Sequence, residues 1–235
     1  MIRLILLTLL IVTIQSMDAQ RFVDPISLFS KNKTAYVTMK DGDKVEGELD
    51  KVKRKKGQVL WVRLELENGE EVELATEDID FAFLPQSGFE KFSVGMDKAT
   101  NVTRWGDESL EGKLIKDGYG YFESQLAQIK RSDEKYYLMQ VLNPHFNKYI
   151  TVYNDPQSGE TMSTSVGGFQ VAGGIDKSYY IQMEDDKPWR LKKKDYDENL
   201  DKLYQDCQKY IPEDTDRVVW KDLPKHIYNY SVNCN

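Results

Sequence analysis

The amino-acid sequence predicts a mainly β protein of the α+β class. A small N-terminal barrel is expected to precede an antiparallel sheet that is covered by one C-terminal amphipathic helix. Apolar and polar residues alternate between turn residues over 34–84, and segments rich in tyrosine, isoleucine and valine follow from 119 onward. The third observation is a helical repeat of apolar residues over 195–211. A chain of 235 residues is long enough for one large or two small hydrophobic cores.

Residues 1–19 have the pattern of a secretory signal peptide. Arg3 supplies a positive charge, an apolar run extends over residues 4–14, and Ala19 is a small residue in front of the expected cleavage site. We therefore expect cleavage between Ala19 and Gln20, and a secreted or periplasmic protein of the cell envelope. No later stretch reaches about 18 apolar residues, so no transmembrane segment is expected after signal removal.

The alternating segment predicts a small antiparallel barrel within residues 20–87. Five strands are expected, at 36–39, 45–49, 59–66, 72–74 and 81–84. The hairpin signature consists of spaced apolar residues, an Asp-Gly turn and a glycine, and its members are Val37, Met39, Asp41, Gly42, Val45, Gly47 and Leu49. This spacing is similar to that of SH3-like and Sm-like small barrels, and the resemblance implies a strongly bent sheet.

The RNA-binding function of Sm-like barrels is not expected here. That site needs an Asn-bearing loop after the second strand and an Arg-Gly pair before the fifth, whereas this chain has a basic run at 51–56 and the acidic segment 75–78. We interpret the basic run as a solvated hairpin loop, and no aromatic residue is interleaved with its lysines in the sequence. A net charge of −7 also opposes binding to phosphate backbones, so no nucleic-acid partner is expected.

The remainder of the chain is predicted to form a second unit. Residues 88–110 are expected to be a connector, residues 111–211 an antiparallel sheet with the helix, and residues 212–235 a packed tail. Strands of this sheet are expected at 119–123, 126–130, 136–142, 149–153, 169–172, 178–183 and 189–191. The aromatic tail is expected to pack, and its sequence leaves a short helix and a strand equally open.

The pattern over 195–211 predicts a single amphipathic helix. Asp195 as the N-cap and Glu198 three residues later match a capping box, and Pro212 ends the helix. The apolar positions fall on one face with a 3.6-residue period, at Tyr196, Leu200, Leu203, Tyr204, Cys207 and Ile211.

Over residues 20–210 the sequence resembles a group of uncharacterised secreted bacterial proteins. The features that carry the likeness are the corner at 142–144, the glycine pairs at 167–168 and 173–174, the segment 178–180, and residues 191–207. The resemblance implies export and this architecture, and it implies no activity.

No catalytic, cofactor-binding or metal-binding residue is predicted. The glycine pairs lack the spacing of a phosphate loop, and neither His145 nor His226 has a second ligand at metal spacing. Cys207 and Cys234 are the only cysteines of the exported chain, and we expect them to form a disulfide. A buried free thiol at 207 and an intermolecular or untethered thiol at 234 are the alternatives.

Two functions are compatible with these observations. The first is an exported, non-enzymatic envelope or extracellular protein, a structural or binding module that contacts a protein or glycan through its tyrosine- and tryptophan-bearing strands. The alternative is a secreted hydrolase that acts on cell-wall or glycan polymers through paired carboxylates.

Overall fold

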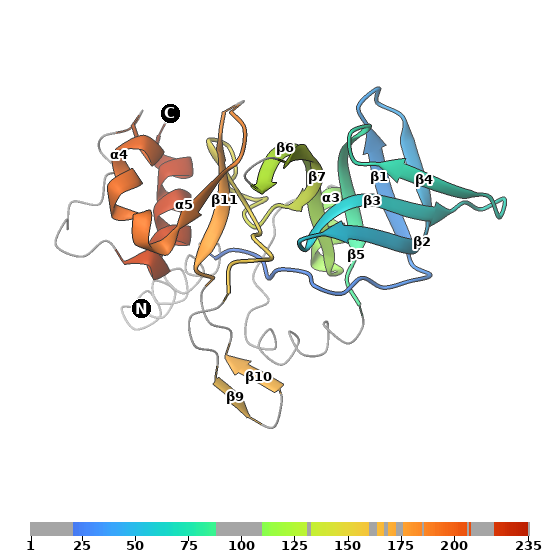
Figure 1. The fold of residues 1–235 in the computed structure, drawn as a ribbon, viewed down its shortest axis with the longest axis horizontal. Coiled ribbons are helices and arrows are strands. Elements are labelled where there is room, and N and C mark those ends of the chain that lie inside the picture. The colour runs from blue at the N-terminus through green and yellow to red at the C-terminus, as the bar shows by residue number, and fades with distance from the viewer. Residues whose placement is uncertain are drawn as a thin grey trace, which may run out of the picture.

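The computed structural model shows a barrel, a small second sheet and a group of helices arranged side by side (Figure 1). It describes residues 21–87, 110–130, 133–159, 164–166, 169–172, 176–184, 186–205, 207 and 219–234. The predicted signal segment with Ala19 and Gln20, most of the connector and both glycine pairs lie outside these residues. A large antiparallel sheet, a second small sheet and a C-terminal helix confirm the predicted β-rich α+β class.

Seven strands form the large sheet. They are β1 (Thr34–Met39), β2 (Lys44–Lys55), β3 (Gln58–Glu65), β4 (Glu71–Ala75), β5 (Ile79–Pro85), β6 (Tyr119–Lys130) and β7 (Asp133–Gln140). Their order is β2-β1-β5-β6-β7-β3-β4, and β2 also pairs with β3. The additional pairing closes six strands into a barrel, from which the β3–β4 hairpin projects.

The barrel draws on more of the chain than the sequence indicates. The five strands expected before residue 87 are all present, but β6 and β7, which we assigned to the second sheet, pair with β5 and β3. The segments 119–123 and 126–130 are one continuous strand rather than two. Alternating apolar and polar residues identify a strand but do not show which strand it pairs with. The pairing of β6 and β7 with the barrel strands was therefore not predictable from the alternation. The division of the chain into two domains stays a prediction.

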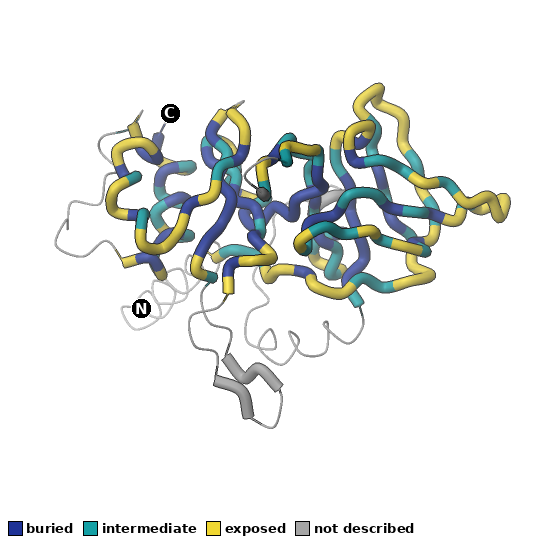
Figure 2. The backbone as a smooth tube through the Cα atoms, in the orientation of Figure 1, coloured by how far each residue is buried: buried dark blue, intermediate teal, exposed yellow. Residues whose placement is uncertain are grey.

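Apolar side chains, most of them aliphatic, fill the barrel. Its buried residues alternate along the strands with residues that point outward, and the interior cluster comprises Ala35, Val37, Leu49, Val59, Val62, Leu64, Ile79, Ala82, Leu84, Phe122 and Leu138. Gly47 is required where β2 crosses β3, because a Cβ atom there would lie 2.7 Å from the carbonyl oxygen of Glu65. Figure 2 shows this buried interior, and it shows the tip of the projecting β3–β4 hairpin as exposed.

The second sheet has three strands and packs against the outside of the barrel. It consists of β8 (Ile150–Tyr153), β11 (Ser178–Met183) and β12 (Trp189–Lys192), in the order β12-β11-β8. Tyr153 and Tyr180 meet Tyr137 and Met139 of β7 in a buried cluster. A separate hairpin is formed by β9 (Thr164–Val166) and β10 (Phe169–Ala172).

The prediction of a single helix over 195–211 is wrong for the residues that the structure describes, 195–205 and 207, and the rest of that segment lies outside the described residues. In its place are two 3-10 turns, η2 (Lys193–Asp195) and η3 (Asp197–Asn199), and one turn of α-helix, α4 (Leu200–Leu203). The Asn199 side-chain amide donates to the Asp195 carbonyl oxygen at 2.6 Å, while the Asn199 backbone amide donates to Tyr196 instead. The Asn199 side chain therefore binds the Asp195 carbonyl oxygen, which in an α-helix would accept from the Asn199 backbone amide.

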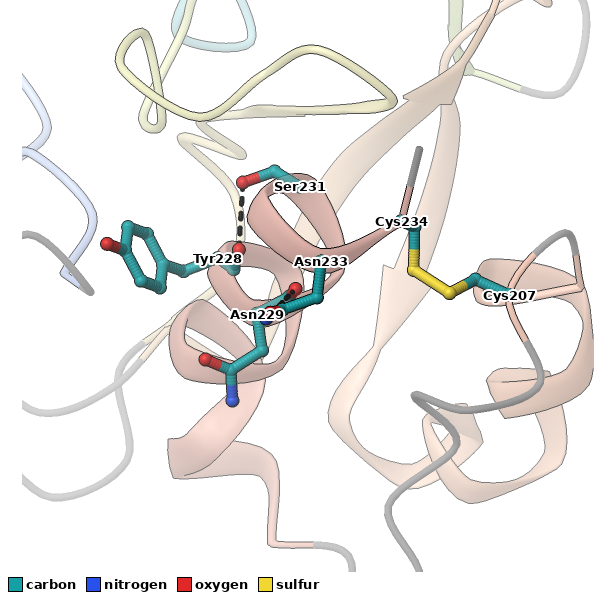
Figure 3. The surroundings of a disulfide bond; sticks show 6 residues. All are labelled: Cys207, Tyr228, Asn229, Ser231, Asn233 and Cys234. Carbon is teal, nitrogen blue, oxygen red and sulfur yellow. Dashed lines mark hydrogen bonds between the residues drawn. A yellow bond between two sulfur atoms is a disulfide. The ribbon is translucent and has the colours of Figure 1, made fainter.

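The longest described helix lies in the tail. After α3 (Leu110–Lys116) and η5 (Trp220–Asp222), α5 extends over Leu223–Asn233 and lies with α4 beside β11 (Figure 1). It buries Leu223, Ile227 and Tyr230 against the second sheet and α4. A disulfide joins Cys207 to Cys234 with Cα atoms 5.8 Å apart, which confirms the predicted bond (Figure 3).

Candidate functional site

The outer surface of β2, β3 and β4 carries a tryptophan among cations. Val62 and Leu64 of β3 are fully buried, so Trp61 and Arg63, which alternate with them, point outward. The strand register places Lys53 and Ala75 on either side of Trp61, and Glu73 beside Arg63. We call this surface the Trp61 face and define it by Lys51, Lys53, Trp61, Arg63 and Ala75.

Two cations lie near the indole ring. The Lys51 ammonium is 5.9 Å and the Arg63 guanidinium 5.8 Å from the ring centroid of Trp61, within the range of cation–π attraction. Trp61 itself is half-buried, whereas Lys51 and Lys53 are exposed. Within the described part of the chain, neither lysine makes an ion pair. The Trp61 face therefore presents an aromatic ring and two ammonium groups whose charge is not neutralised.

Arg63 differs from these lysines because its charge is compensated. Its guanidinium lies 3.1 Å from Glu71, 3.7 Å from Asp50 and 3.9 Å from Glu73. These carboxylates belong to an acidic row further along the same strands, where Glu48, Glu65 and Glu71 are cross-strand neighbours. The outer surface of β2 and β3 is therefore basic toward the β2–β3 turn and acidic toward the other end.

Residues 51–55 of the basic run lie in β2 and do not form the solvated loop that we expected. The hairpin turn is confined to Lys56 and Gly57, and successive side chains of β2 point to opposite sides. Arg54 donates to the carbonyl oxygen of Ser27 at 2.6 Å, and Lys55 forms a close ion pair with Asp133, which raises the pKa of Lys55.

The aromatic neighbour of these lysines was missed because it is adjacent across the strands and not along the chain. Counting outward from the tight turn before Gln58 brings β3 alongside the basic run but places Val52 opposite Trp61, and a β-bulge between Lys53 and Arg54 shifts the register so that Lys53 faces Trp61. The turn residues were readable in the sequence, but the bulge that sets the register of the Trp61 face was not.

A hollow of about 590 Å³ lies at the acidic end of the same surface. It is lined by Lys44, Val45, Glu46, Leu66, Glu67 and Asn68. The side chains of Glu46 and Glu67 are exposed. The hollow is therefore a shallow feature of the surface whose two carboxylates face water.

A second group of aromatic rings lies on β1, β5 and β6. Its ring centroids are 5.1 to 6.2 Å apart with the planes tilted or perpendicular, and its members are Tyr36, Phe81, Phe83, Tyr119 and Tyr121. Phe83 is only 4% exposed. These rings contact one another at tilted or perpendicular angles, which favours a packing role over a flat contact surface.

About half of the described tyrosines are interior. Seven of the thirteen in the described part of the chain are buried, namely Tyr137, Tyr153, Tyr179, Tyr180, Tyr196, Tyr204 and Tyr230. The Tyr153 hydroxyl lies 2.6 Å from Glu123 Oε2 and 2.5 Å from Gln182 Oε1 and donates its one proton to one of these two acceptors, and burial raises its pKa strongly. These side chains belong to the core, so the expectation that tyrosine-bearing strands form the contact surface is too broad.

Asp155, the most buried carboxylate among the described residues, is held by hydrogen bonds and an ion pair within the protein. The Asp155 side chain is 1% exposed, and it accepts from the Ser178 hydroxyl at 2.6 Å and from Arg190 Nε at 2.5 Å. It also accepts from the backbone amide of Gln157 at 3.0 Å. This network ties the loop after β8 to β11 and β12, and it leaves Asp155 poorly placed for chemistry on a ligand.

The two histidines are separate. His145 is exposed in the loop before β8, and His226 lies on α5 with its Nδ1 2.6 Å from the hydroxyl of Tyr196. Burial lowers the pKa of His226. Among the described residues, no group of three or more His, Cys, Asp or Glu side chains is arranged to hold a metal ion.

Comparison of this chain with known proteins does not assign it to a family. No protein-family model, no curated protein and no solved structure matches this chain. In the described part of the chain, no helix has the length and apolar character needed to cross a bilayer.

Proposed function

We propose that this chain is an exported, non-enzymatic module that binds a glycan or protein partner of the cell envelope or its surroundings through the Trp61 face. The observation that carries the proposal is the half-buried Trp61 ring beside two exposed lysines, Lys51 and Lys53, that make no ion pair with any described residue. Tryptophan provides a large apolar area with few rotatable bonds, and it is enriched among the residues that dominate binding energy.

The position of this ring on a closed barrel favours binding. Strands β2 and β3 are paired along most of their length, and the buried Val62 and Leu64 hold the intervening Trp61 in place. Because the ring is already held in place, the protein loses little conformational entropy when a ligand stacks on it.

Export is supported by two features. Residues 1–19 have the composition of a signal peptide, and the Cys207–Cys234 disulfide is typical of oxidising compartments such as the periplasm or the extracellular space. We propose cleavage between Ala19 and Gln20 and a location in one of these two compartments.

Binding of purified protein to immobilised envelope polysaccharides and to fractionated envelope proteins tests the proposal. The test variant is Trp61→Ala, and Trp189→Ala is a matched control because Trp189 is also half-buried on a strand with Lys202 4.0 Å from its ring centroid. We expect Trp61→Ala to weaken binding at least about 30-fold, as for a central aromatic contact, and Trp189→Ala to leave it unchanged. Absence of wild-type binding, or equal losses in both variants, would contradict the proposal.

The alternative function, a secreted glycan hydrolase, has one specific feature in its favour. Glu46 and Glu67 line the same hollow, as a pair of acid–base carboxylates would. Both are exposed, however, whereas a carboxyl that acts as general acid is held in apolar surroundings. Release of reducing sugars from wall polysaccharide by wild type, abolished in Glu46→Gln and Glu67→Gln, would establish hydrolysis. No release by wild type would remove this alternative.

A further inference from the structure

We infer that the partner of the Trp61 face is an anionic saccharide, one that bears carboxylate or phosphate groups on its sugar rings. This inference rests on the proposed function and makes its ligand class specific. Trp61 would stack on the apolar face of a sugar, and Lys51 and Lys53 would bind the acidic substituents.

The two lysines are placed to act together. They are two residues apart on one strand without a register shift between them, so both ammonium groups leave the same side of the sheet. Residues so spaced are separated by roughly 6.5 Å along a strand, and Trp61 lies opposite Lys53. The three side chains thus form one compact patch that fits a ring with a charged substituent.

Charge complementarity favours an anionic ligand. The whole chain has a net charge of −7, yet Lys51 and Lys53 are exposed and make no ion pair with a described residue. Arg63 and Lys55, their neighbours in space and in sequence, are both bound to carboxylates. An ammonium group is a compact donor for a carboxylate or phosphate oxygen, and an unpaired one is free to accept that partner.

The surroundings of the patch restrict how far an anion can extend. The acidic row of Glu48, Glu65 and Glu71 lies on the same surface beyond Arg63, and it would repel a polyanion that continued along the strands. A nucleic-acid strand also requires several aromatic rings for successive bases, and the Trp61 face supplies one. A saccharide unit that contacts only the basic end avoids both difficulties.

Arg63 is a positioning residue for this patch. Its guanidinium is held by Asp50, Glu71 and Glu73 and lies 5.8 Å from the Trp61 ring centroid. Since its charge is compensated, the salt dependence of binding should come from Lys51 and Lys53.

A matched pair of polysaccharides tests the inference. Polygalacturonate carries one carboxylate on each sugar, and its fully methyl-esterified form has the same backbone without charge; a phosphate-bearing mannan distinguishes the two anion types. Affinities are measured by titration calorimetry at 50, 150 and 300 mM NaCl for wild type and the double variant Lys51→Gln/Lys53→Gln. The control is Lys192→Gln/Lys193→Gln, which removes the same charge from exposed residues of β12 and η2.

We expect wild type to prefer an acidic polymer over the ester and to lose affinity as salt rises. Lys51→Gln/Lys53→Gln should bind about tenfold more weakly at 50 mM NaCl with a flatter salt dependence, and the control should match wild type. Circular dichroism and the thermal midpoint of each variant verify that the fold is retained.

Two results would overturn the inference and leave the proposed function intact, and a third would overturn both. Equal binding of acid and ester, unaffected by the lysine changes but abolished in Trp61→Ala, would show a neutral saccharide. Capture of an envelope protein through Trp61, with no saccharide bound, would show a protein partner. Equally tight, Trp61-independent binding of DNA would show nonspecific charge attraction, and in that case the proposed function would fail as well.

Discussion

The barrel and the C-terminal half of the molecule are stabilised in different ways. The barrel interior is aliphatic, with Val62 and Leu64 fully buried, and its strands are held by backbone pairing. The C-terminal half instead buries aromatic rings with polar ends. The Trp220 indole donates to the Asp176 carbonyl oxygen at 2.7 Å, and the Tyr196 and Tyr204 hydroxyls lie 3.1 Å apart.

This difference in packing indicates which half of the molecule has side chains available for binding. In the C-terminal half, most polar groups at the ends of aromatic side chains already have partners within the protein, so these rings serve packing. The interior cluster of the barrel is apolar, so the outward-facing positions of its strands can carry a surface such as the Trp61 face at little cost in stability.

Loss of the disulfide should have the largest effect on stability. The bond closes a loop with a sequence separation of 27, for which chain entropy predicts about 3–4 kcal/mol. We expect Cys207→Ser/Cys234→Ser to lower the free energy of unfolding by this amount in urea denaturation. Reductant should destabilise wild type equally and leave the double variant unaffected. Insensitivity of wild type to reductant would show that the C-terminus is held by packing alone.

An intermediate effect on stability is expected from replacing an arginine, and its size should differ between the two halves of the molecule. Arg190 pairs with Asp155, whose side chain is 1% exposed, whereas Arg63 pairs with Glu71, whose side chain is 59% exposed. Arg190→Gln should cost about 2 kcal/mol because a buried carboxylate loses its charge partner, less than for a fully buried pair since Arg190 is 37% exposed. Arg63→Gln should cost under about 1 kcal/mol. Equal losses in urea titrations would contradict the distinction between the two halves.

The smallest predicted effect is a pH dependence at His226. Burial lowers its pKa, with Asp222 opposing and Lys225 adding to that shift, and the Tyr196 hydroxyl lies against Nδ1. The unfolded chain, with a histidine pKa near about 6.5, therefore binds more protons than the folded one. Stability should be full above that pH and decline as pH falls through the folded pKa.

Urea midpoints at pH 7.5 and 5.5 measure this dependence. His226→Gln should lose less stability than wild type over this interval, since the substituted side chain does not titrate. An identical decline in both proteins would assign the pH dependence to other groups.

The barrel strands were predictable because their signals are local. Asp41-Gly42 and Asn68-Gly69 mark two turns, both glycines have positive φ, and the alternation between turns is regular. Residues 219–234 were less clear, although Leu223, Ile227 and Tyr230 recur at helical spacing and Pro224 occupies an early helical position.

The remaining differences depend on contacts that the sequence does not display. The apolar period from Tyr196 to Tyr204 correctly identified buried residues, but it did not show that the Asn199 side chain would bind the Asp195 carbonyl oxygen in place of the backbone amide. Similarly, the pairing of Lys53 with Trp61 depends on strand register, and the candidate site could be located only once that register was known.

The central claim, that the Trp61 face is the binding surface, is tested most directly by fluorine NMR of protein labelled with 5-fluorotryptophan. The four indole resonances are assigned by tryptophan-to-phenylalanine variants, and polygalacturonate is added to saturation. We predict that the Trp61 resonance shifts or broadens while those of Trp189 and the buried Trp220 stay in place. An unchanged Trp61 resonance at saturation would contradict the claim.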